Sequence, residues 1–476
     1  MKNMSSHLLD MIELADSHRR ASRWHDAIKI YAQVNLIHAD FAAIKQNLSL
    51  CYFATAQFQL ASQLCREAIL LDPQLWQAHI LLAKCFRKMG EPLQAEAQFR
   101  SVLKKNPLHG EARLGLADLA LNEFGDPLGA TAWVDPLISL PEFSQDAKLT
   151  KLMASLYDRD IGSIELNQQI IQFSKQSLQI PSSELPRYQH KVHQRQANRI
   201  RVGILSPLLC VSPVYFLTIA FFKGLAQGCD LIFFNRGTQH DWATVAFEEI
   251  ASGWFNVAPL SAIELAKFLY GQQLDVIYDL GGWMDPIGLR ALSVKPAKTQ
   301  FKWIGGQSVT TGLDCFDGWI GDPWQSPLTA QPLYTEKLIN SAEDYAQYTQ
   351  PPYLPKQASR KIEAWGIFAN PAKVSRAFLK KIAELPGKKC FIHRQFKYDQ
   401  IRERIESILK PREVEYLCPQ THLEALKMLN RHAKILDTFP YSSGLTAREA
   451  MAMGTQIEVL SVGMLFCERH TARYQS

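Results

Sequence analysis

Residues 41–74 read FAAIKQNLSLCYFATAQFQLASQLCREAILLDPQ, and residues 75–108 read LWQAHILLAKCFRKMGEPLQAEAQFRSVLKKNPL. The two stretches align without a gap because small residues and prolines recur every 34 positions; the recurring residues are Ala27, Ala61, Ala95, Pro73, Pro107 and Pro141. Small alanines let two antiparallel helices approach closely, and each proline ends one helix pair before the next begins. The pattern predicts a stack of helix pairs.

Two further copies extend the array. Residues 109–143 follow the same plan with one extra residue near Gly125, and residues 8–41 form a weaker first copy with Ala39 at the proline position. The 34-residue period resembles the tetratricopeptide repeat, and that resemblance implies a concave face that binds a peptide or protein. The alternative is an amphipathic helix bundle with accidental spacing.

The composition is that of a soluble globular protein. A chain of 476 residues has room for about three domains, and its charged content of 21% is ordinary. The net charge of +6 comes partly from the basic stretch 187–201 (RYQHKVHQRQANRIR), which we interpret as a solvated linker. Lysines and arginines do not alternate with aromatic residues, so we expect no nucleic-acid partner.

Cysteine usage and hydropathy indicate a cytoplasmic location. The nine cysteines are scattered and never form a C-x-x-C pair, which fits a reducing compartment. Residues 1–20 lack the apolar core of a secretory signal. The longest apolar run, 214–222, is about half of the roughly 18 residues that span a bilayer. We therefore expect no membrane span.

The pattern changes after residue 199, where short apolar runs alternate with helical stretches. We predict a first group of buried parallel strands at 201–206, 230–234, 275–280 and 299–304, with helices at 241–250 and 261–270. We predict a second group at 363–368, 389–392, 414–417, 434–436 and 457–461, with helices at 374–385, 398–409, 422–431 and 447–453. Such alternation predicts two doubly wound Rossmann-like sheets.

The predicted organisation has five segments. They are the repeat array (1–145), a helical and basic linker (146–199), a first Rossmann-like half (200–347), a proline-rich connector (348–361) and a second Rossmann-like half that looks truncated (362–476). The fold class is thus an α-helical solenoid followed by α/β domains. Acidic Glu458 inside the last apolar run is unusual for a buried strand.

Several strings in the two predicted halves carry a family resemblance. In the first half these are RVGILS (201–206), WIGG (303–306), TTG (310–312) and LYTEKL (333–338). In the second half they are NPAK (370–373), LDTFPYSSGLTARE (436–449) and AMG (452–454). Together the strings resemble the O-linked N-acetylglucosamine transferase family and its SPINDLY-type relatives. The resemblance implies an inverting GT-B glycosyltransferase that moves a sugar, N-acetylglucosamine from a UDP conjugate, onto Ser or Thr of a protein acceptor held by the repeats. It implies no metal and no cofactor beyond the nucleotide sugar.

The resemblance also implies a donor site. Lys373 would contact the leaving diphosphate, Asn370 would bind nearby, and Glu449 would bind the ribose diol. Backbone N–H groups and a hydroxyl would come from Ser443, Gly444, Leu445 and Thr446. Structural readings stay open: Lys373 as a solvated helix lysine, Glu449 as a first-turn acid, and Asp437 as a cap of the following turn.

The acceptor or sugar cleft is expected at the Gly305–Gly306 pair with Thr310 and Thr311. Base candidates are Tyr215 and His393, followed by Asp279 and Asp285. A phosphate oxygen or water could equally accept the proton, so that no side-chain base is needed.

Departures from the family pattern leave alternatives. Leu208 and Ser212 stand at positions where the family has an acid and a histidine, and Ala425 and Gly444 stand at two further histidine positions. SPINDLY-type relatives also lack the histidine at Gly444, and His422, three residues from Ala425, could act instead. These departures favour a catalytically degenerate repeat scaffold as the main alternative. An N-linked glucosyltransferase is disfavoured by the repeats. The donor sugar, acceptor, linkage and oligomeric state are not specified by the sequence.

Overall fold

The computed structural model describes residues 6–190, 199–306 and 308–475. The chain forms two compact units: Met1–Glu123 with Gly129–Lys151, and Phe124–Leu128 with Leu152–Ser476. Part of the basic stretch 187–201, residues 191–198, lies outside the described residues.

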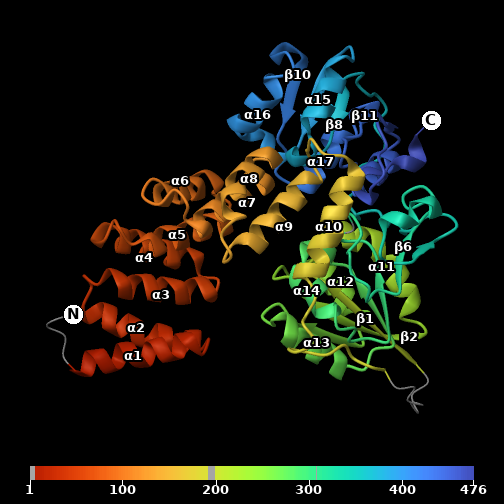
Figure 1. The fold of residues 1–476 in the computed structure, drawn as a ribbon. Helices are drawn as coiled ribbons and strands as arrows, with labels where there is room; N and C mark the ends of the chain where they lie inside the picture. Colours follow the sequence, from red (N-terminus) through yellow and green to blue (C-terminus); the bar gives the residue numbers. More distant parts are fainter. Residues whose placement is uncertain (1–5, 191–198, 307, 476) are drawn as a thin grey trace. The chain divides into compact units, whose positions relative to one another are not determined.

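Helices alone build the first unit, and they are shown in red and orange in Figure 1. Successive helices pair as predicted: α1 (Ser6–Arg20) with α2 (Trp24–Ile37), α3 (Ala42–Ala54) with α4 (Phe58–Leu71), and α5 (Trp76–Lys88) with α6 (Pro92–Leu103). The last repeat contributes α7 (Gly110–Asn122), which packs against α6, and α8 (Pro127–Val134). The recurring Ala27, Ala61 and Ala95 are each 0% exposed, so the small side chains lie where the helices touch. The predicted array of helix pairs is confirmed.

The extra residue of the last repeat lies in a turn. Residues 89–91 join α5 to α6, whereas residues 123–126 join α7 to α8. Both turns contain a glycine with positive φ, Gly90 at 75° and Gly125 at 55°. The longer turn belongs, from Phe124 onward, to the second compact unit. Helices α9 (Ser144–Ser155) and α10 (Ser163–Ser177) follow.

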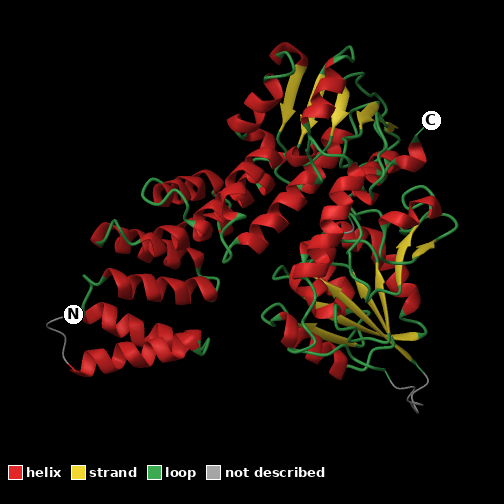
Figure 2. Cartoon of the chain, viewed as in Figure 1, coloured by secondary structure: helices red, strands yellow, loops and turns green. Residues whose placement is uncertain are grey.

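Seven parallel strands form the first sheet of the second unit, in the order β3-β2-β1-β4-β5-β6-β7. The strands are β1 (Ile200–Ser206), β2 (Cys229–Asn235), β3 (Gly253–Asn256), β4 (Val276–Asp279), β5 (Thr299–Lys302), β6 (Gly318–Gly321) and β7 (Leu338–Asn340). Helices α11 (Pro213–Leu225), α12 (Trp242–Glu248), α13 (Ala262–Gly271) and α14 (Pro286–Leu292) connect them. Figure 2 shows the strands of this sheet in yellow among the helices.

Five parallel strands form the second sheet, in the order β10-β9-β8-β11-β12. They are β8 (Trp365–Ile367), β9 (Lys389–Ile392), β10 (Val414–Leu417), β11 (Lys434–Leu436) and β12 (Gln456–Glu458). The connecting helices are α15 (Arg376–Ala383), α16 (Asp399–Glu406), α17 (His422–Leu429) and α18 (Leu445–Ala452). The helical solenoid followed by Rossmann-like α/β domains is therefore confirmed.

The sequence did not predict three strands of the first sheet. Strand β3 is half-exposed, and β6 and β7 are short and follow irregular segments, so none has the long apolar run that marks a buried strand. In the second sheet β12 is shorter than the predicted 457–461 and lies at the edge. The edge position explains Glu458, because its side chain reaches solvent.

A buried lysine fastens the loops after β4 and β5. Lys302 is 0% exposed, and its Nζ donates to the carbonyl oxygens of Asp279, Ile304 and Gly305 at 2.9, 2.7 and 2.7 Å. The carboxylate of Asp279 lies 3.5 Å away and accepts hydrogen bonds from two loop N–H groups. Ile304 has a φ of 45°, a conformation that β-branched residues rarely adopt, so these bonds hold the chain in a strained turn.

None of the helices within the described residues has the length and apolar character needed to cross a bilayer.

We expect Lys302→Met to lower the free energy of unfolding of the second unit by about 3–5 kcal/mol, because it leaves the buried Asp279 without its cation. The matched control is Lys298→Met. Lys298 pairs with Asp275 at 2.7 Å but is 36% exposed, so its loss should cost under about 1 kcal/mol. Urea titration followed by tryptophan fluorescence measures both. Equal losses in the two variants would contradict this account of Lys302.

Candidate functional site

The direction in which the chain builds the second sheet reverses between two inner strands. Strands β8 and β11 are neighbours, but the chain leaves them toward opposite ends of the sheet. In open parallel sheets, ligands bind outside the carboxyl ends of strands at such a reversal. The loop after β8 carries Asn370 and Lys373, and the loop after β11 carries Ser443 and Gly444, which are four of the predicted donor-site residues.

Lys373 ends a short 3-10 turn, η4 (Pro371–Lys373), directly before α15. Asn370 caps this turn, since its Oδ1 accepts from the N–H of Ala372 at 2.9 Å. The Nζ of Lys373 donates to the carbonyl oxygen of Ser442 at 2.9 Å and lies 4.5 Å from the centre of the Tyr441 ring. Burial lowers the pKa of Lys373 to about 8, although the nearby Asp437 opposes the shift.

Asp437 follows β11 and is 2% exposed. Its Oδ1 accepts from the N–H of Ser443 at 2.7 Å, and its Oδ2 accepts from the hydroxyl of Thr471. Burial raises the pKa of Asp437 to about 6, while the hydrogen bonds to Thr471 and Ser443 and the charge of Lys373 act in the opposite direction. The carboxylate thus closes the turn 437–443 and supplies the charge that faces Lys373.

The segment 442–446 leads into α18. Gly444 precedes the first helical residue, Leu445, and Thr446 lies in the first turn. A Cβ built on Gly444 would meet only the ring of His470, at 4.0 Å, so this position has room for a side chain. The hydroxyl of Ser442 donates to the carbonyl oxygen of Cys467 at 2.8 Å, which ties the segment to the C-terminal turn.

Glu449 lies one turn into α18 and pairs with a histidine from the neighbouring helix. Its Oε1 lies 2.9 Å from Nε2 of His422, and Nδ1 of His422 lies 3.1 Å from the Tyr353 hydroxyl. Burial raises the pKa of Glu449, and the contact with His422 opposes this shift. Both residues were singled out from the sequence, but the pairing between them was not predicted. Ala425, at the position where the family has a histidine, is a buried residue of α17 and is 5% exposed.

The four residues predicted to line the acceptor or sugar cleft have two different structural roles in the first sheet. Gly305 and Gly306 have φ values of 43° and 55° at the carboxyl end of β5, and an added Cβ would lie 2.0 Å from a backbone oxygen at either position. Thr310 and Thr311 are buried, and both hydroxyls donate to the carboxylate of Glu336. The glycine pair therefore shapes the loop, while the two threonines satisfy a buried acid.

The base candidates all have structural partners. Asp285 forms a buried bidentate pair with Arg236, at 2.9 and 3.2 Å, and Asp279 belongs to the Lys302 cluster. Tyr215 packs edge-on against Trp242 and Phe247 in the core.

His393 caps the turn that follows β9, and burial lowers its pKa to about 4. The identity of a base, if the reaction uses one, stays a prediction.

A C-terminal turn contacts the loops of both sheets. The N–H of Cys467 donates to the carbonyl oxygen of Ser308, and the Cys467 carbonyl accepts from the N–H of Ser442, each at 2.8 Å. Phe466 packs edge-on against Trp319, and Glu468 forms a buried ion pair with Arg159. These partners are distant in sequence, so no local signal could have predicted them.

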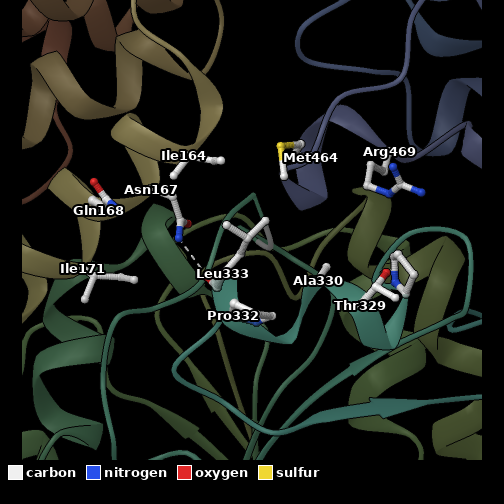
Figure 3. Close-up of a pocket in the computed structure, with 11 residues that line it drawn as sticks. Ile164, Asn167, Gln168, Ile171, Thr329, Ala330, Pro332, Leu333, Met464 and Arg469 are labelled. Carbon is white, nitrogen blue, oxygen red and sulfur yellow. Dashed lines mark hydrogen bonds between the residues drawn. The ribbon is translucent and has the colours of Figure 1, made fainter.

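A cavity of about 470 Å³ lies elsewhere in the second unit, between α10, the 3-10 turn η3 (Leu328–Leu333) and the C-terminal turn. Figure 3 shows its mainly apolar lining, which includes Ile164, Ile171, Pro332 and Met464. The dashed line marks the Asn167 amide, which donates to the Leu333 carbonyl at 2.9 Å. None of the predicted site residues lines this cavity.

The lowered pKa of Lys373 has a chemical consequence. We expect its amine to react with acetic anhydride with a midpoint near pH 8, well below an ordinary lysine. Asp437→Asn should shift the midpoint lower still, because it removes the charge that opposes the effect of burial. Mass spectrometry of competitively labelled peptides measures this, with the exposed Lys380 on α15 as the internal reference. A Lys373 midpoint above 10 would contradict it.

The chain is similar to known proteins in sequence and in fold. A tetratricopeptide-repeat family model matches residues 80–144. The chain is 27% identical over 220 residues to a protein of Solanum lycopersicum named probable UDP-N-acetylglucosamine–peptide N-acetylglucosaminyltransferase SPINDLY, covering 42% of this chain and 23% of that protein. It is 23% identical over 336 residues to the protein of the same name from Oryza sativa subsp. japonica, covering 65% and 35%.

Among solved structures, a mutant O-GlcNAc transferase from Thermobaculum terrenum superposes with a TM-score of 0.62. The match covers 98% of this chain and 86% of that one, at 20% sequence identity, and it confirms the GT-B arrangement of the α/β region. The chain spans about a quarter to a third of the length of the curated relatives. It is thus similar in sequence to SPINDLY-type proteins and similar in fold to an O-GlcNAc transferase, as its motifs predicted.

Proposed function

We propose that the chain is an inverting, nucleotide-sugar-dependent protein glycosyltransferase. It transfers a sugar, N-acetylglucosamine from UDP-N-acetylglucosamine, to Ser or Thr of a protein that the repeat array holds. UDP-N-acetylglucosamine is the donor that the names of the SPINDLY-type relatives give. No cofactor and no metal takes part in the proposed reaction.

The observation that carries the proposal is the cation at the strand reversal. Lys373 lies at the carboxyl edge of the second sheet beside the amino end of α18, where backbone N–H groups and an ammonium can converge on phosphate oxygens. Asp437 favours the charged form of Lys373 between the two pKa values, about 6 and about 8. The Lys373 ammonium is therefore cationic at neutral pH, but it loses its proton at a lower pH than an ordinary lysine.

The chemistry follows from this placement. The hydroxyl oxygen of the acceptor attacks the anomeric carbon, a new C–O bond forms, and the bond from that carbon to the diphosphate oxygen breaks. The electron pair leaves with the nucleoside diphosphate, whose added negative charge Lys373 and the N–H groups of residues 444–446 stabilise. The hydroxyl proton passes to a phosphate oxygen or to water.

A repeat scaffold with an inactive α/β part is the second candidate, and two residues favour it. Ser212, at the family's histidine position, caps α11 through a hydrogen bond from Val214 at 3.2 Å. Leu208, at the acidic position, packs against the hydrophobic core of the first sheet. Neither residue can exchange a proton in the manner of the side chain it replaces.

Calorimetric titration with UDP separates the candidates. We expect micromolar binding to the full chain, and a loss of about 30-fold in Lys373→Met, since a charge-assisted contact contributes about 2 kcal/mol. Lys380→Met, on the helix α15 that follows Lys373, is the matched control and should bind as the parent does. Absence of binding to UDP, GDP and their sugar conjugates would leave the scaffold as the function.

The affinity for UDP should also depend on pH. Lys373 carries its charge below its pKa of about 8, so the dissociation constant should be lowest at neutral pH and rise above pH 8, levelling off about 30-fold higher, where the parent binds as weakly as Lys373→Met. Lys373→Arg keeps its charge throughout this range and should abolish the rise. A parent protein whose affinity stays constant from pH 7 to pH 10 would exclude this role for Lys373.

A further inference from the structure

The extra residue of the last repeat lies against the loop that carries Lys373. Gly125 packs so closely that a Cβ built on it would lie 2.4 Å from the Cβ of Pro371 and 2.6 Å from the backbone nitrogen of Ala372. Gly125 also has a φ of 55°, in the left-handed region. The turn 123–126 therefore touches the backbone of η4 directly, two residues before Lys373.

Neighbouring side chains add to the contact between the Gly125 turn and Pro371. Phe124 is buried and meets the ring of Tyr398 edge-on, with the ring centres 5.6 Å apart. Arg404 donates to the carbonyl oxygen of Pro371 at 3.0 Å, and the carboxylate of Asp126 attracts its guanidinium. Pro371 is thus held from the side of the turn and from the side of α16.

A second turn of the helical region holds the other end of the Lys373 loop. Asp158 accepts from the N–H of Arg376 at 2.9 Å, at the first residue of α15. Tyr157 stacks on Tyr441, the ring that covers the Lys373 ammonium, with centres 4.8 Å apart and planes 10° apart. The loop 370–376 is therefore bounded by two turns that precede the α/β sheets in sequence.

We propose that Gly125 is a positioning residue, and that the turn 123–126 fixes the place of Lys373 for the leaving diphosphate of the nucleotide donor. This inference rests on the proposed function. A displacement of Pro371 reaches Lys373 through η4. The backbone N–H groups of Ala372 and Lys373 each donate a hydrogen bond of 2.9 Å to Asn370, so η4 moves as a unit. Displacing Pro371 would carry Lys373 away from the Ser442 carbonyl, which lies 2.9 Å from its Nζ.

The chain provides a matched control. Gly90 occupies the equivalent turn of the preceding repeat, with a φ of 75°, and a Cβ added there would meet no atom within 4 Å. Gly90→Ala and Gly125→Ala therefore impose similar backbone strain on two repeat turns. Only Gly125→Ala also pushes on the Lys373 loop.

The test is calorimetric titration of the full chain with UDP and with uridine. We expect Gly125→Ala to weaken UDP binding at least tenfold and uridine binding less than twofold, because only the diphosphate contacts Lys373. Gly90→Ala should leave both affinities within twofold. Added to Lys373→Met, Gly125→Ala should have no further effect, since both changes remove the same interaction. Equal UDP affinities in Gly90→Ala and Gly125→Ala, or full additivity with Lys373→Met, would overturn the proposal.

Hydrogen–deuterium exchange separates this inference from the proposed function. Gly125→Ala should raise the exchange rate of the amides of residues 372–378, while Gly90→Ala leaves it unchanged. If the parent binds no nucleotide, the proposed function fails and the diphosphate role of Gly125 fails with it; faster exchange would still establish the contact. If Gly125→Ala does not fold, Gly125→Asn against Gly90→Asn replaces it, because asparagine tolerates positive φ but still carries a Cβ.

Discussion

The candidate site depends on one electrostatic arrangement, the lysine and aspartate that face each other after β8 and β11. Each is disfavoured as an ion by burial, and each favours the charge of the other. Asp437 could not remain ionised there without the hydrogen bonds from Thr471 and Ser443, which fix the turn that leads into α18. The Asp437 carboxylate therefore determines both the position of the amino end of α18 and the charge of Lys373.

The features that could be predicted from the sequence are those that repeat along the chain or depend on a short stretch of residues. Alanine and proline spacing was enough for the repeats, since each helix packs on its neighbours along the chain. Long apolar runs marked the central strands β1, β2, β4 and β9, but β3, β6 and β7 are too short or too exposed to give that signal. The positions of Lys373, Gly444 and Glu449 came from resemblance to a family, and their roles toward a donor are proposals.

Contacts between distant segments could not be predicted. Lys302 reads as an ordinary strand lysine, yet it is fully buried because three backbone carbonyls converge on its ammonium. The imidazole of His422 and the carboxylate of Glu449 come together only when α17 and α18 pack on the same sheet. The residues that depart from the family pattern are likewise understandable after folding: Ser212 caps a helix and Ala425 fills a core.

The connectivity of the two kinds of domain has a consequence for synthesis on the ribosome. A repeat completes its core with residues that have just been made, so the array can form progressively as the chain emerges. The second sheet cannot, because its central strand β8 needs β11, and the Lys373 loop acquires its counter-charge only when Asp437 has been translated. The turn 123–126 is made before its partner Pro371, and residues 126–370, about half of the chain, separate Gly125 from Pro371. Phe124, which is buried in the folded protein, lacks its ring partner Tyr398 until that part of the chain has been made.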